Sequence, residues 1–319
     1  MTASRVLVTG ATGFVGSALV ERLLSEDGWI PAAGCRQASL VPLRAEHVLT
    51  PSLASNADWS RAVYGVDVVV HAAARVHVMN DAQADPLTAY RKANVAGTLT
   101  LARQAAQVGV KRFVFVSSIK VNGERTRPGD VFRATDVPAP EDPYGISKAE
   151  AEAGLFAIGR DTGMEIVVVR PPLVYGPGVK GNFAQLLCWV RRGVPLPLGA
   201  VNNRRSLVGL DNLVDLLVKC LDHPQAAGKV FLVSDGEDLS TTGLLKKVAA
   251  ALGQSALLLP VPPAMLRAGA RLLRRPEVAQ RLLDSLQIDM TFTQETLAWN
   301  PPMSVDQELR RTVAPLLPR

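Results

Sequence analysis

The fold is decided by the stretch Arg5-Val-Leu-Val-Thr-Gly10-Ala-Thr-Gly13-Phe-Val-Gly16-Ser-Ala-Leu19. A short apolar run ends in three glycines at three-residue spacing, and a helix-forming segment follows. This pattern is typical of a parallel sheet that presents a helix N-terminus to a pyrophosphate. Gly10 permits the sharp turn, Gly13 lets a dinucleotide approach the backbone N–H groups, and Gly16 lets helix and strand pack closely. The stretch therefore predicts a dinucleotide-binding unit.

The composition is that of an ordinary globular protein. The chain has 319 residues, is 48% hydrophobic and carries a formal net charge of +6, so it can bury a sizeable core in one large or two fused lobes. This moderate charge suits an anionic ligand, a nucleic acid or a membrane surface, and the motifs must decide among them. The three cysteines, at 35, 188 and 220, show no paired spacing. Neither a disulfide framework nor a metal site is expected, and a cytoplasmic location is the simplest.

No membrane-spanning or signal segment is expected. The N-terminus enters a strand without an apolar signal core, and no apolar run approaches the roughly 20 residues that cross a bilayer. The nearest case, residues 256–266, contains prolines and leads to Arg267, Arg271, Arg274 and Arg275. We expect a loop and then a basic amphipathic helix with a solvated face, and docking on a membrane surface is the alternative.

Apolar runs alternate with helical stretches along the chain, as in a parallel sheet built from βαβ units. The expected strands are 6–9, 66–73, 112–116, 166–169 and 230–233, and the expected helices are about 85–108, 144–160, 182–192 and 240–252. We predict an α/β fold: a doubly wound, Rossmann-type parallel sheet with a smaller C-terminal α/β substrate lobe. The dinucleotide-binding domain is expected over 1–175, with its sheet completed by about 206–234, and the substrate lobe over 176–205 and 235–319.

A second pattern carries acid–base chemistry. Ser118 follows the strand 112–116, and Tyr144 and Lys148 stand 26 and 30 residues after it. The four-residue spacing puts the tyrosine and the lysine on one helix face, near each other and near a cofactor ribose. A phenol has a pKa of about 10, and positive charge from the lysine and from an oxidised nicotinamide stabilises its phenolate. Ser118 can hydrogen-bond the substrate oxygen whose carbon gains or loses hydride.

With this glycine turn, serine and Tyr–Lys pair, the chain resembles the extended short-chain dehydrogenase/reductase superfamily. The resemblance is to its NAD(P)-dependent nucleotide-sugar epimerase/dehydratase branch and covers nearly the whole chain. Further matching segments are His71-Ala-Ala-Ala74, Asn94-Val-Ala-Gly-Thr98, Arg170-Pro-Pro-Leu-Val-Tyr-Gly-Pro177 and Arg205-Ser-Leu-Val-Gly-Leu-Asp-Asn212. The resemblance implies that Ser118, Tyr144 and Lys148 are catalytic. The candidate cofactor-binding residues are Gly10, Thr12, Gly13, Phe14, Val15, Gly16, Arg36, Ser52, Leu53, Ala72, Ala73, Ala74, Asn94, Tyr144, Lys148 and Pro171. The candidate substrate-binding residues are Arg75, His77, Ser118, Lys120, Asn182 and Arg205.

Two departures from the family pattern bear on the reaction. Sugar 4,6-dehydratases place an Asp-Glu pair after the strand-end serine or threonine, whereas this chain has Ile119 and Lys120, so dehydration is not expected. NAD-retaining epimerases usually carry an aspartate after the second strand, whereas this chain reads Ile30-Pro-Ala-Ala-Gly-Cys-Arg36. Arg36 suits a 2′-phosphate, which favours NADP(H) and leaves NAD(H) possible.

The segments Ser117-Ser-Ile-Lys-Val-Asn-Gly-Glu124 and Leu283-Asp-Ser-Leu-Gln287 look closest to bacterial reductases that make UDP-N-acetylquinovosamine or related sugars for surface polysaccharide such as O-antigen. We therefore expect NADPH-dependent reduction of the 4-keto group of a UDP-4-keto-6-deoxy-N-acetylhexosamine. One alternative is a 4-epimerase of UDP-N-acetylglucosamine or UDP-glucose with tightly bound NAD. The other is a non-catalytic nucleotide-binding regulator. A UDP-sugar, but no nucleic acid, is the expected partner, and the resemblance implies a homodimer formed through helices 86–108 and 144–160.

Overall fold

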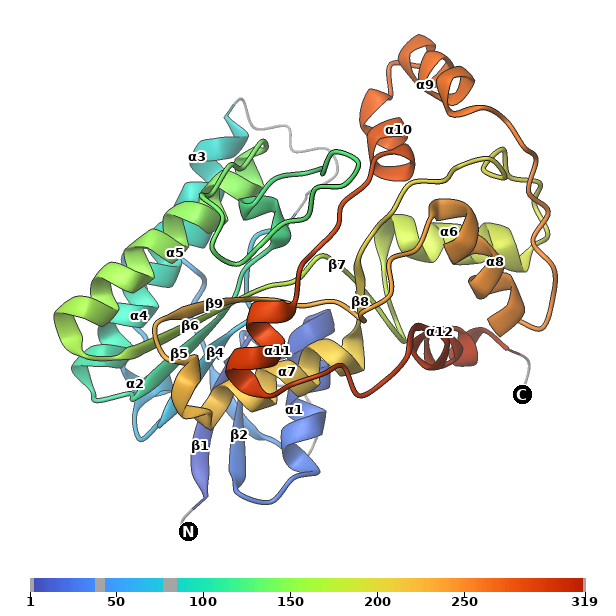
Figure 1. Ribbon diagram of the computed structural model, residues 1–319. Helices are drawn as coiled ribbons and strands as arrows, with labels where there is room; N and C mark the ends of the chain where they lie inside the picture. Colours follow the sequence, from blue (N-terminus) through green and yellow to red (C-terminus); the bar gives the residue numbers. More distant parts are fainter. Residues whose placement is uncertain (1–2, 38–43, 77–84, 318–319) are drawn as a thin grey trace.

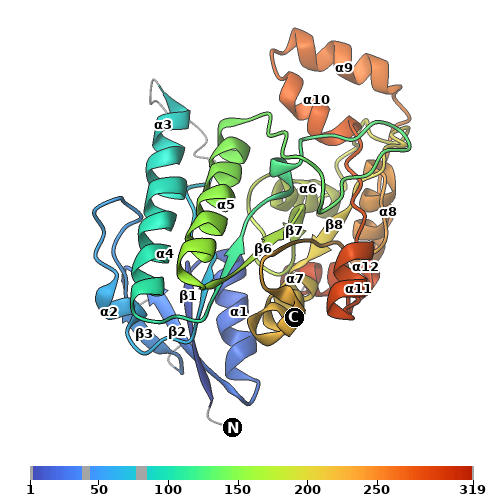
Figure 2. The ribbon, with the colours of Figure 1, turned by 60° about the vertical axis from the view of Figure 1, so that its left-hand side comes forward.

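The computed structural model describes residues 3–37, 44–76 and 85–317, and within these ranges a sheet of seven parallel strands forms the centre of the molecule. Its strand order is β3-β2-β1-β4-β5-β6-β9; Figure 1 labels these strands except β3, which Figure 2 labels. The strands are β1 (Ser4–Thr9), β2 (Trp29–Cys35), β3 (Glu46–Leu49), β4 (Val68–His71), β5 (Arg112–Val116), β6 (Glu165–Arg170) and β9 (Lys229–Leu232). The predicted doubly wound α/β fold is confirmed.

Helices cover both faces of this sheet (Figure 2). On one face, α1 (Phe14–Leu24) and α7 (Leu210–Asp222) bury leucine and valine side chains against β1, β4 and β6. On the other face, α4 (Thr98–Gln107) and α5 (Pro143–Thr162) bury leucine, isoleucine and alanine side chains against the sheet, with the short α2 (Ser60–Val63) beside them. Apart from the mostly exposed edge strand β3, the strands are largely buried, which explains why they appear in the sequence as apolar runs.

The order of the strands places the crevice of the molecule. From β1 the chain steps outward to β2 and β3, and it then returns to β4 on the other side of β1. Loops that leave the carboxyl ends of β1 and β4 therefore diverge in opposite directions. Ligands of open α/β sheets bind at such a switch point.

The helix expected over 85–108 is interrupted. Its parts are α3 (Pro86–Tyr90), a π-helical segment η2 (Arg91–Gly97) and α4. A Cβ atom at Gly97 would lie 2.8 Å from the backbone carbonyl carbon of Leu53, so this turn packs directly against the loop that follows β3. Single π-helical turns occur often near functional sites, and this one holds Asn94, which the sequence assigned to the cofactor.

A smaller lobe is built from segments that follow β6. Its two-stranded parallel sheet pairs β7 (Leu173–Tyr175) with β8 (Leu207–Gly209). Its helices are α6 (Gly181–Arg191), α8 (Thr241–Ala251), α9 (Pro263–Leu272), α10 (Pro276–Leu283) and α12 (Val305–Val313). Within the segment 206–234, β9 pairs with β6 in the large sheet, whereas β8 pairs with β7 in the small one.

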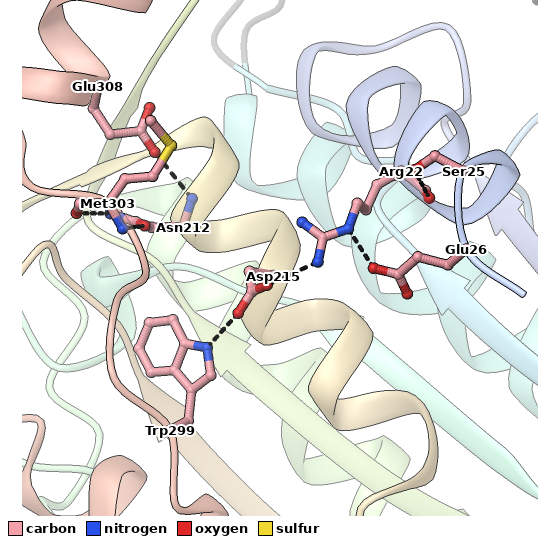
Figure 3. A network of polar contacts seen from close by, with 8 residues as sticks. All are labelled: Arg22, Ser25, Glu26, Asn212, Asp215, Trp299, Met303 and Glu308. Carbon is pink, nitrogen blue, oxygen red and sulfur yellow. Dashed lines mark hydrogen bonds and ion pairs between the residues drawn. The ribbon is translucent and has the colours of Figure 1, made fainter.

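Helix α7 is held by polar contacts from several other segments, which Figure 3 shows. Asp215 accepts hydrogen bonds from Arg22 of α1 (3.0 Å) and from the Trp299 indole (2.8 Å), just after α11 (Thr291–Leu297). Asn212 exchanges two hydrogen bonds of 2.9 Å with the backbone of Met303.

None of the helices in the described part of the chain is long and apolar enough to span a bilayer.

Candidate active site

A cleft of about 740 Å³ opens at the carboxyl ends of β1, β2, β4 and β5. It brings together the glycine turn, the serine pair after β5 and the start of α5, which are distant in sequence. Of the residues expected at the site, those that line it are Gly10, Thr12, Gly13, Phe14, Val15, Gly16, Arg36, Ser52, Leu53, Ala72, Ala73, Ala74, Arg75, Ser118, Tyr144, Lys148 and Pro171.

The glycine turn has the shape that a dinucleotide phosphate needs. Gly10 has a φ of +72°, and a Cβ there would lie 2.8 Å from the backbone nitrogen of Ala73. A Cβ at Gly16 would lie 2.2 Å from the carbonyl oxygen of Gly10, so helix and turn touch directly. Gly13 caps α1 with no side-chain hydrogen bond, which leaves the first N–H groups of the helix to the cleft. These residues fit NAD(P).

Tyr144 stands on the first turn of α5 and lines the cleft. Its ring packs edge-on against Tyr90, with 5.9 Å between centroids. Burial raises the pKa of the Tyr144 phenol above its ordinary value, and Asp142 and Tyr90 raise it further. The protein groups alone therefore keep this phenol protonated at neutral pH.

Lys148 is buried one turn after Tyr144. Its Nζ donates to the carbonyl oxygen of Val116 (2.7 Å) at the end of β5 and lies 4.0 Å from the centroid of the Phe115 ring. Burial lowers the pKa of Lys148 to about 7, although the Glu152 carboxylate opposes the shift. The expected stabilisation of a phenolate by this lysine is thus weaker than the sequence suggests, because desolvation disfavours its own charge.

A buried polar network lies beneath these residues, and the sequence analysis missed it. Arg170, at the end of β6, forms an ion pair with Glu152, and its second branch donates to Asn122 (2.9 Å). Ser117 also donates to Glu152. The sequence does contain a sign of this network: Glu152 stands four residues after Lys148, and therefore on the same, buried face of the helix. The network joins β5, α5 and β6 directly under the cleft.

Asn94 was predicted to bind the cofactor, but it does not line the cleft. It is buried in η2, where its side chain accepts from the backbone nitrogen of Arg75 (2.8 Å) and donates to the Arg75 carbonyl (3.0 Å). It also donates to Ser147 (3.1 Å) on α5. Asn94 thus holds the loop after β4 against the helix that carries Tyr144.

Lys120 also lies outside the lining of the cleft. Its ammonium pairs with Glu124 (2.7 Å) and Asp142 (2.5 Å). Burial alone would lower the pKa of Lys120, but the hydrogen bonds to these carboxylates outweigh it and raise that pKa. Asp142 also caps α5 by accepting from the backbone nitrogen of Gly145. Lys120 therefore steadies the start of the helix that bears Tyr144.

The remaining candidates are dispersed. Arg205 lies in the smaller lobe and donates to the carbonyl of Asp284 (3.0 Å), and burial lowers its pKa. Asn182 is exposed at the start of α6, outside the cleft lining. His77 lies outside the described residues. Arg36 is exposed directly after β2, at the edge of the cleft.

His71, at the end of β4, is fully buried between two threonines. Its ring nitrogens lie 2.7 Å from the Thr9 hydroxyl and 3.0 Å from the Thr98 hydroxyl. Burial, with the nearby charge of Lys148, lowers its pKa to about 3. This histidine is neutral at physiological pH and links β1, β4 and α4.

Known proteins similar to this chain include NAD-dependent enzymes, in agreement with a cleft whose residues fit NAD(P). The model of the "NAD dependent epimerase/dehydratase family" matches residues 6–234. A Vibrio cholerae protein described as a UDP-glucose 4-epimerase is 46% identical over 98% of this chain and 95% of its own length.

Two solved structures share the fold across both lobes. The UDP-glucose 4-epimerase of Thermotoga maritima with UDP-glucose has a TM-score of 0.76 and 23% identity, covering 97% of each chain. The UDP-glucuronic acid 4-epimerase of Bacillus cereus with NAD has a TM-score of 0.77 and 21% identity, also covering 97% of each chain.

Proposed function

The chain belongs to the NAD dependent epimerase/dehydratase family, and on this premise we propose that it is a UDP-hexose 4-epimerase. It takes UDP-glucose or UDP-N-acetylglucosamine and inverts the configuration at C4, with no net consumption of cofactor. The observation that carries this proposal is the 46% identity to the Vibrio cholerae UDP-glucose 4-epimerase across 98% of the chain. It favours epimerisation over the 4-keto reduction expected from the sequence.

The cleft supports chemistry at a carbinol carbon. With positive charge beside it, the Tyr144 phenolate would take the proton of the sugar C4 hydroxyl when C4 is oxidised and return it when C4 is reduced, and the Ser118 Oγ would hydrogen-bond the same oxygen. The bound nicotinamide supplies the hydride acceptor and donor at C4. The Lys148 Nζ donates one hydrogen bond to the Val116 carbonyl, and its remaining N–H donors would hold the cofactor ribose.

The residues after Ser118 argue against elimination of water. Ile119 is buried, and the Lys120 ammonium is paired with two carboxylates. Neither side chain can act as the additional acid and base that a 4,6-dehydratase needs at these positions. Oxidation followed by reduction at one carbon needs only the acid–base group already in the cleft.

The experiment is to incubate the purified protein, without added cofactor, with UDP-glucose and to follow UDP-galactose by chromatography. Cofactor is extracted from the same preparation and identified by its absorbance and mass. Interconversion together with retained NAD is the expected result. A preparation that releases no nicotinamide nucleotide and converts neither UDP-glucose nor UDP-N-acetylglucosamine would refute the proposal.

One observation favours a second candidate, the NADPH-dependent 4-keto reductase. Arg36 follows β2 at the edge of the cleft, and the described residues from Ile30 to Arg36 include no carboxylate. A carboxylate there usually accepts the hydroxyls of the adenosine ribose, whereas an arginine accommodates a 2′-phosphate. Oxidation of NADPH upon addition of a UDP-4-keto-6-deoxy sugar, without turnover of UDP-glucose, would establish this function.

We also propose that the enzyme acts in the cytoplasm as a homodimer, as its family resemblance implies. Helices α4 and α5 lie side by side on one face of the sheet (Figure 2). Ala149, Ala153 and Ala157 follow each other at four-residue spacing on α5, and all three are at least partly exposed. Such a row of small side chains lets another helix pack closely.

A further inference from the structure

Helices α9 and α10 form a hairpin that projects from the smaller lobe, in Figure 1 at the upper right and in Figure 2 again at the top. The inner side of the hairpin packs on the lobe through Leu266, Ala279 and Leu282, which are partly buried. No residue of α9 is fully buried. The hairpin therefore has a large surface that the rest of the described chain does not cover.

That surface includes several large, exposed apolar side chains. Met265 on α9 is 64% exposed, and Leu272, seven residues further on, is 85% exposed. This spacing puts both side chains on the same face of the helix. Leu273 in the turn and Val278 on α10 are also exposed. Large apolar side chains grouped on one projecting element commonly mark an interaction surface.

The same hairpin carries most of the excess charge of the protein. Residues 263–283 hold five arginines and one glutamate, which accounts for four of the six excess positive charges of the chain. Arg267 pairs with Asp284 (2.9 Å). The other four are exposed, and within the described ranges they form no ion pair; they are Arg271, Arg274, Arg275 and Arg281.

From this combination we propose that the α9–α10 hairpin docks on an anionic lipid bilayer. Met265, Leu272 and Leu273 enter the boundary between headgroups and acyl chains, while the unpaired arginines contact anionic headgroups. Interfacial helices bind membranes through this pairing of exposed apolar residues with flanking cations. The sequence alone favoured a solvated helix, because it did not show that Met265 and Leu272 lie outside the core.

Other occupants fit these observations less well. A second copy on a two-fold axis would bring the arginine clusters of both chains together, and like charges oppose such contact. A nucleic acid would be met by the arginines but would leave the leucines and the methionine without an apolar partner. A bilayer with anionic headgroups satisfies both kinds of side chain.

The test is cosedimentation of the full-length protein with vesicles of phosphatidylcholine, with and without phosphatidylglycerol, at low and high salt. We expect binding to the anionic vesicles that weakens with salt. A triple variant, Arg271→Gln/Arg274→Gln/Arg275→Gln, should weaken binding by about fivefold for each arginine. The pair Leu272→Ser/Leu273→Ser should abolish the binding that persists at high salt.

Matched controls come from exposed residues elsewhere. Arg61→Gln/Arg192→Gln/Arg310→Gln removes the same charge, and Val137→Ser removes an apolar side chain that is 85% exposed; both should bind vesicles like the parent. Absence of binding to anionic vesicles would overturn the proposal. So would equal loss in the controls, equally tight binding to duplex DNA, or a vesicle-independent dimer that the leucine variant dissociates.

This inference is independent of the proposed function. The hairpin residues do not line the cleft, so the hairpin variants should turn over dissolved UDP-sugar at the parental rate. A failure of the epimerase assay with intact vesicle binding, or the reverse, tells the two proposals apart.

Discussion

Tyr144 lines the cleft, where we propose that its phenol passes a proton to and from the sugar C4 oxygen. Because the proton matters mainly in the transition state, Tyr144→Phe should lower kcat by about 10²–10⁴-fold with a much smaller change in KM. The measurement is steady-state turnover of the UDP-sugar. Near-parental kcat in this variant would remove Tyr144 from the mechanism.

The matched control for this prediction is Tyr64→Phe. Tyr64 is 77% exposed and lies outside the cleft, so loss of its hydroxyl should leave both kcat and KM unchanged. A comparable loss of kcat in both variants would point to a general effect on folding instead of to a proton-transfer role.

Glu152 and Arg170 form a buried ion pair beneath the cleft. Removal of one partner leaves the other charge buried without compensation, so Glu152→Gln should lower the free energy of unfolding by about 3–5 kcal/mol. The Glu152→Leu/Arg170→Met double variant should lose less than Glu152→Gln, because it buries no unpaired charge. Urea denaturation of the parent and the variants provides the comparison. A double variant less stable than the single one would contradict this account.

Side chains with distinctive chemistry and short-range spacing were the most predictable part of the site. The glycine turn, Ser118 and the Tyr144–Lys148 pair lie on one cleft, where local rules of strand, turn and helix place them. Asn94 and Lys120 were predicted to bind ligands. In the structure, Asn94 contacts the Arg75 backbone and Lys120 contacts the Asp142 carboxylate, which the tertiary fold brings near, and Lys120 also pairs with its sequence neighbour Glu124. A sequence pattern shows which side chains are able to bind a ligand, but not whether another part of the folded chain already occupies them.

The π-helical segment η2 sets the relation between the loop after β4 and helix α5 through Asn94. Asn94→Ala removes three hydrogen bonds, two of them to the Arg75 backbone. The loop after β4 lines the cofactor cleft, so we expect weaker retention of the nicotinamide cofactor, on the order of tenfold. The cofactor content of the purified variant, measured after dialysis, checks this. Full retention would show that the loop holds its position without Asn94.

Helix α12 contributes a buried acid to the start of α7. Glu308 accepts from the backbone nitrogen of Asn212 (3.0 Å), and its other carboxylate oxygen has no partner within the described part of the chain. Burial raises the pKa of Glu308 to about 7, and the nearby charges of Asp211 and Asp235 also raise it. Between the ordinary pKa and this value, the folded protein binds more protons than the unfolded chain. The free energy of unfolding should therefore fall as the pH rises toward 7.

Glu308→Gln keeps the acceptor for Asn212 and removes the ionisation. We expect this variant to be more stable than the parent at pH above 7, by on the order of 2 kcal/mol, and to lose this part of the pH dependence. Tm measured across the pH range tests both effects. The exposed Glu295→Gln is the control. A Glu308→Gln variant less stable than the parent at alkaline pH would show that the native carboxylate is charged and stabilising.

The strands were easier to predict than their connections. Parallel strands buried on both faces appear in the sequence as apolar runs. The observed bounds of β4, β5, β6 and β9 overlap the strands expected from such runs. The pairing of β8 with β7 was not predictable, because three residues of ordinary apolar character fit either sheet. The π-helical turn was also missed, since the close approach of Gly97 to Leu53 has no local signal.

The two lobes meet through side chains that are distant in the chain. Asn212 on α7 donates to the carbonyl of Met303 just before α12, and Glu308 on α12 accepts from the backbone nitrogen of Asn212 (Figure 3). The sequence predicts a smaller C-terminal lobe but not these contacts. They fix the smaller lobe against the helical face opposite to α4 and α5, which leaves that pair of helices accessible.

The accessible helices α4 and α5 are the expected contact surface of the proposed homodimer. If α4 and α5 pair with the same helices of a second copy, Ala153→Arg places a large charged side chain in the centre of that contact. We expect the parent to be a dimer by light scattering and this variant to be monomeric. Gln107→Arg, at the exposed end of α4, is the control and should remain dimeric. A parent that is monomeric at all concentrations tested, or a dimer that tolerates Ala153→Arg, would place the contact elsewhere or exclude it.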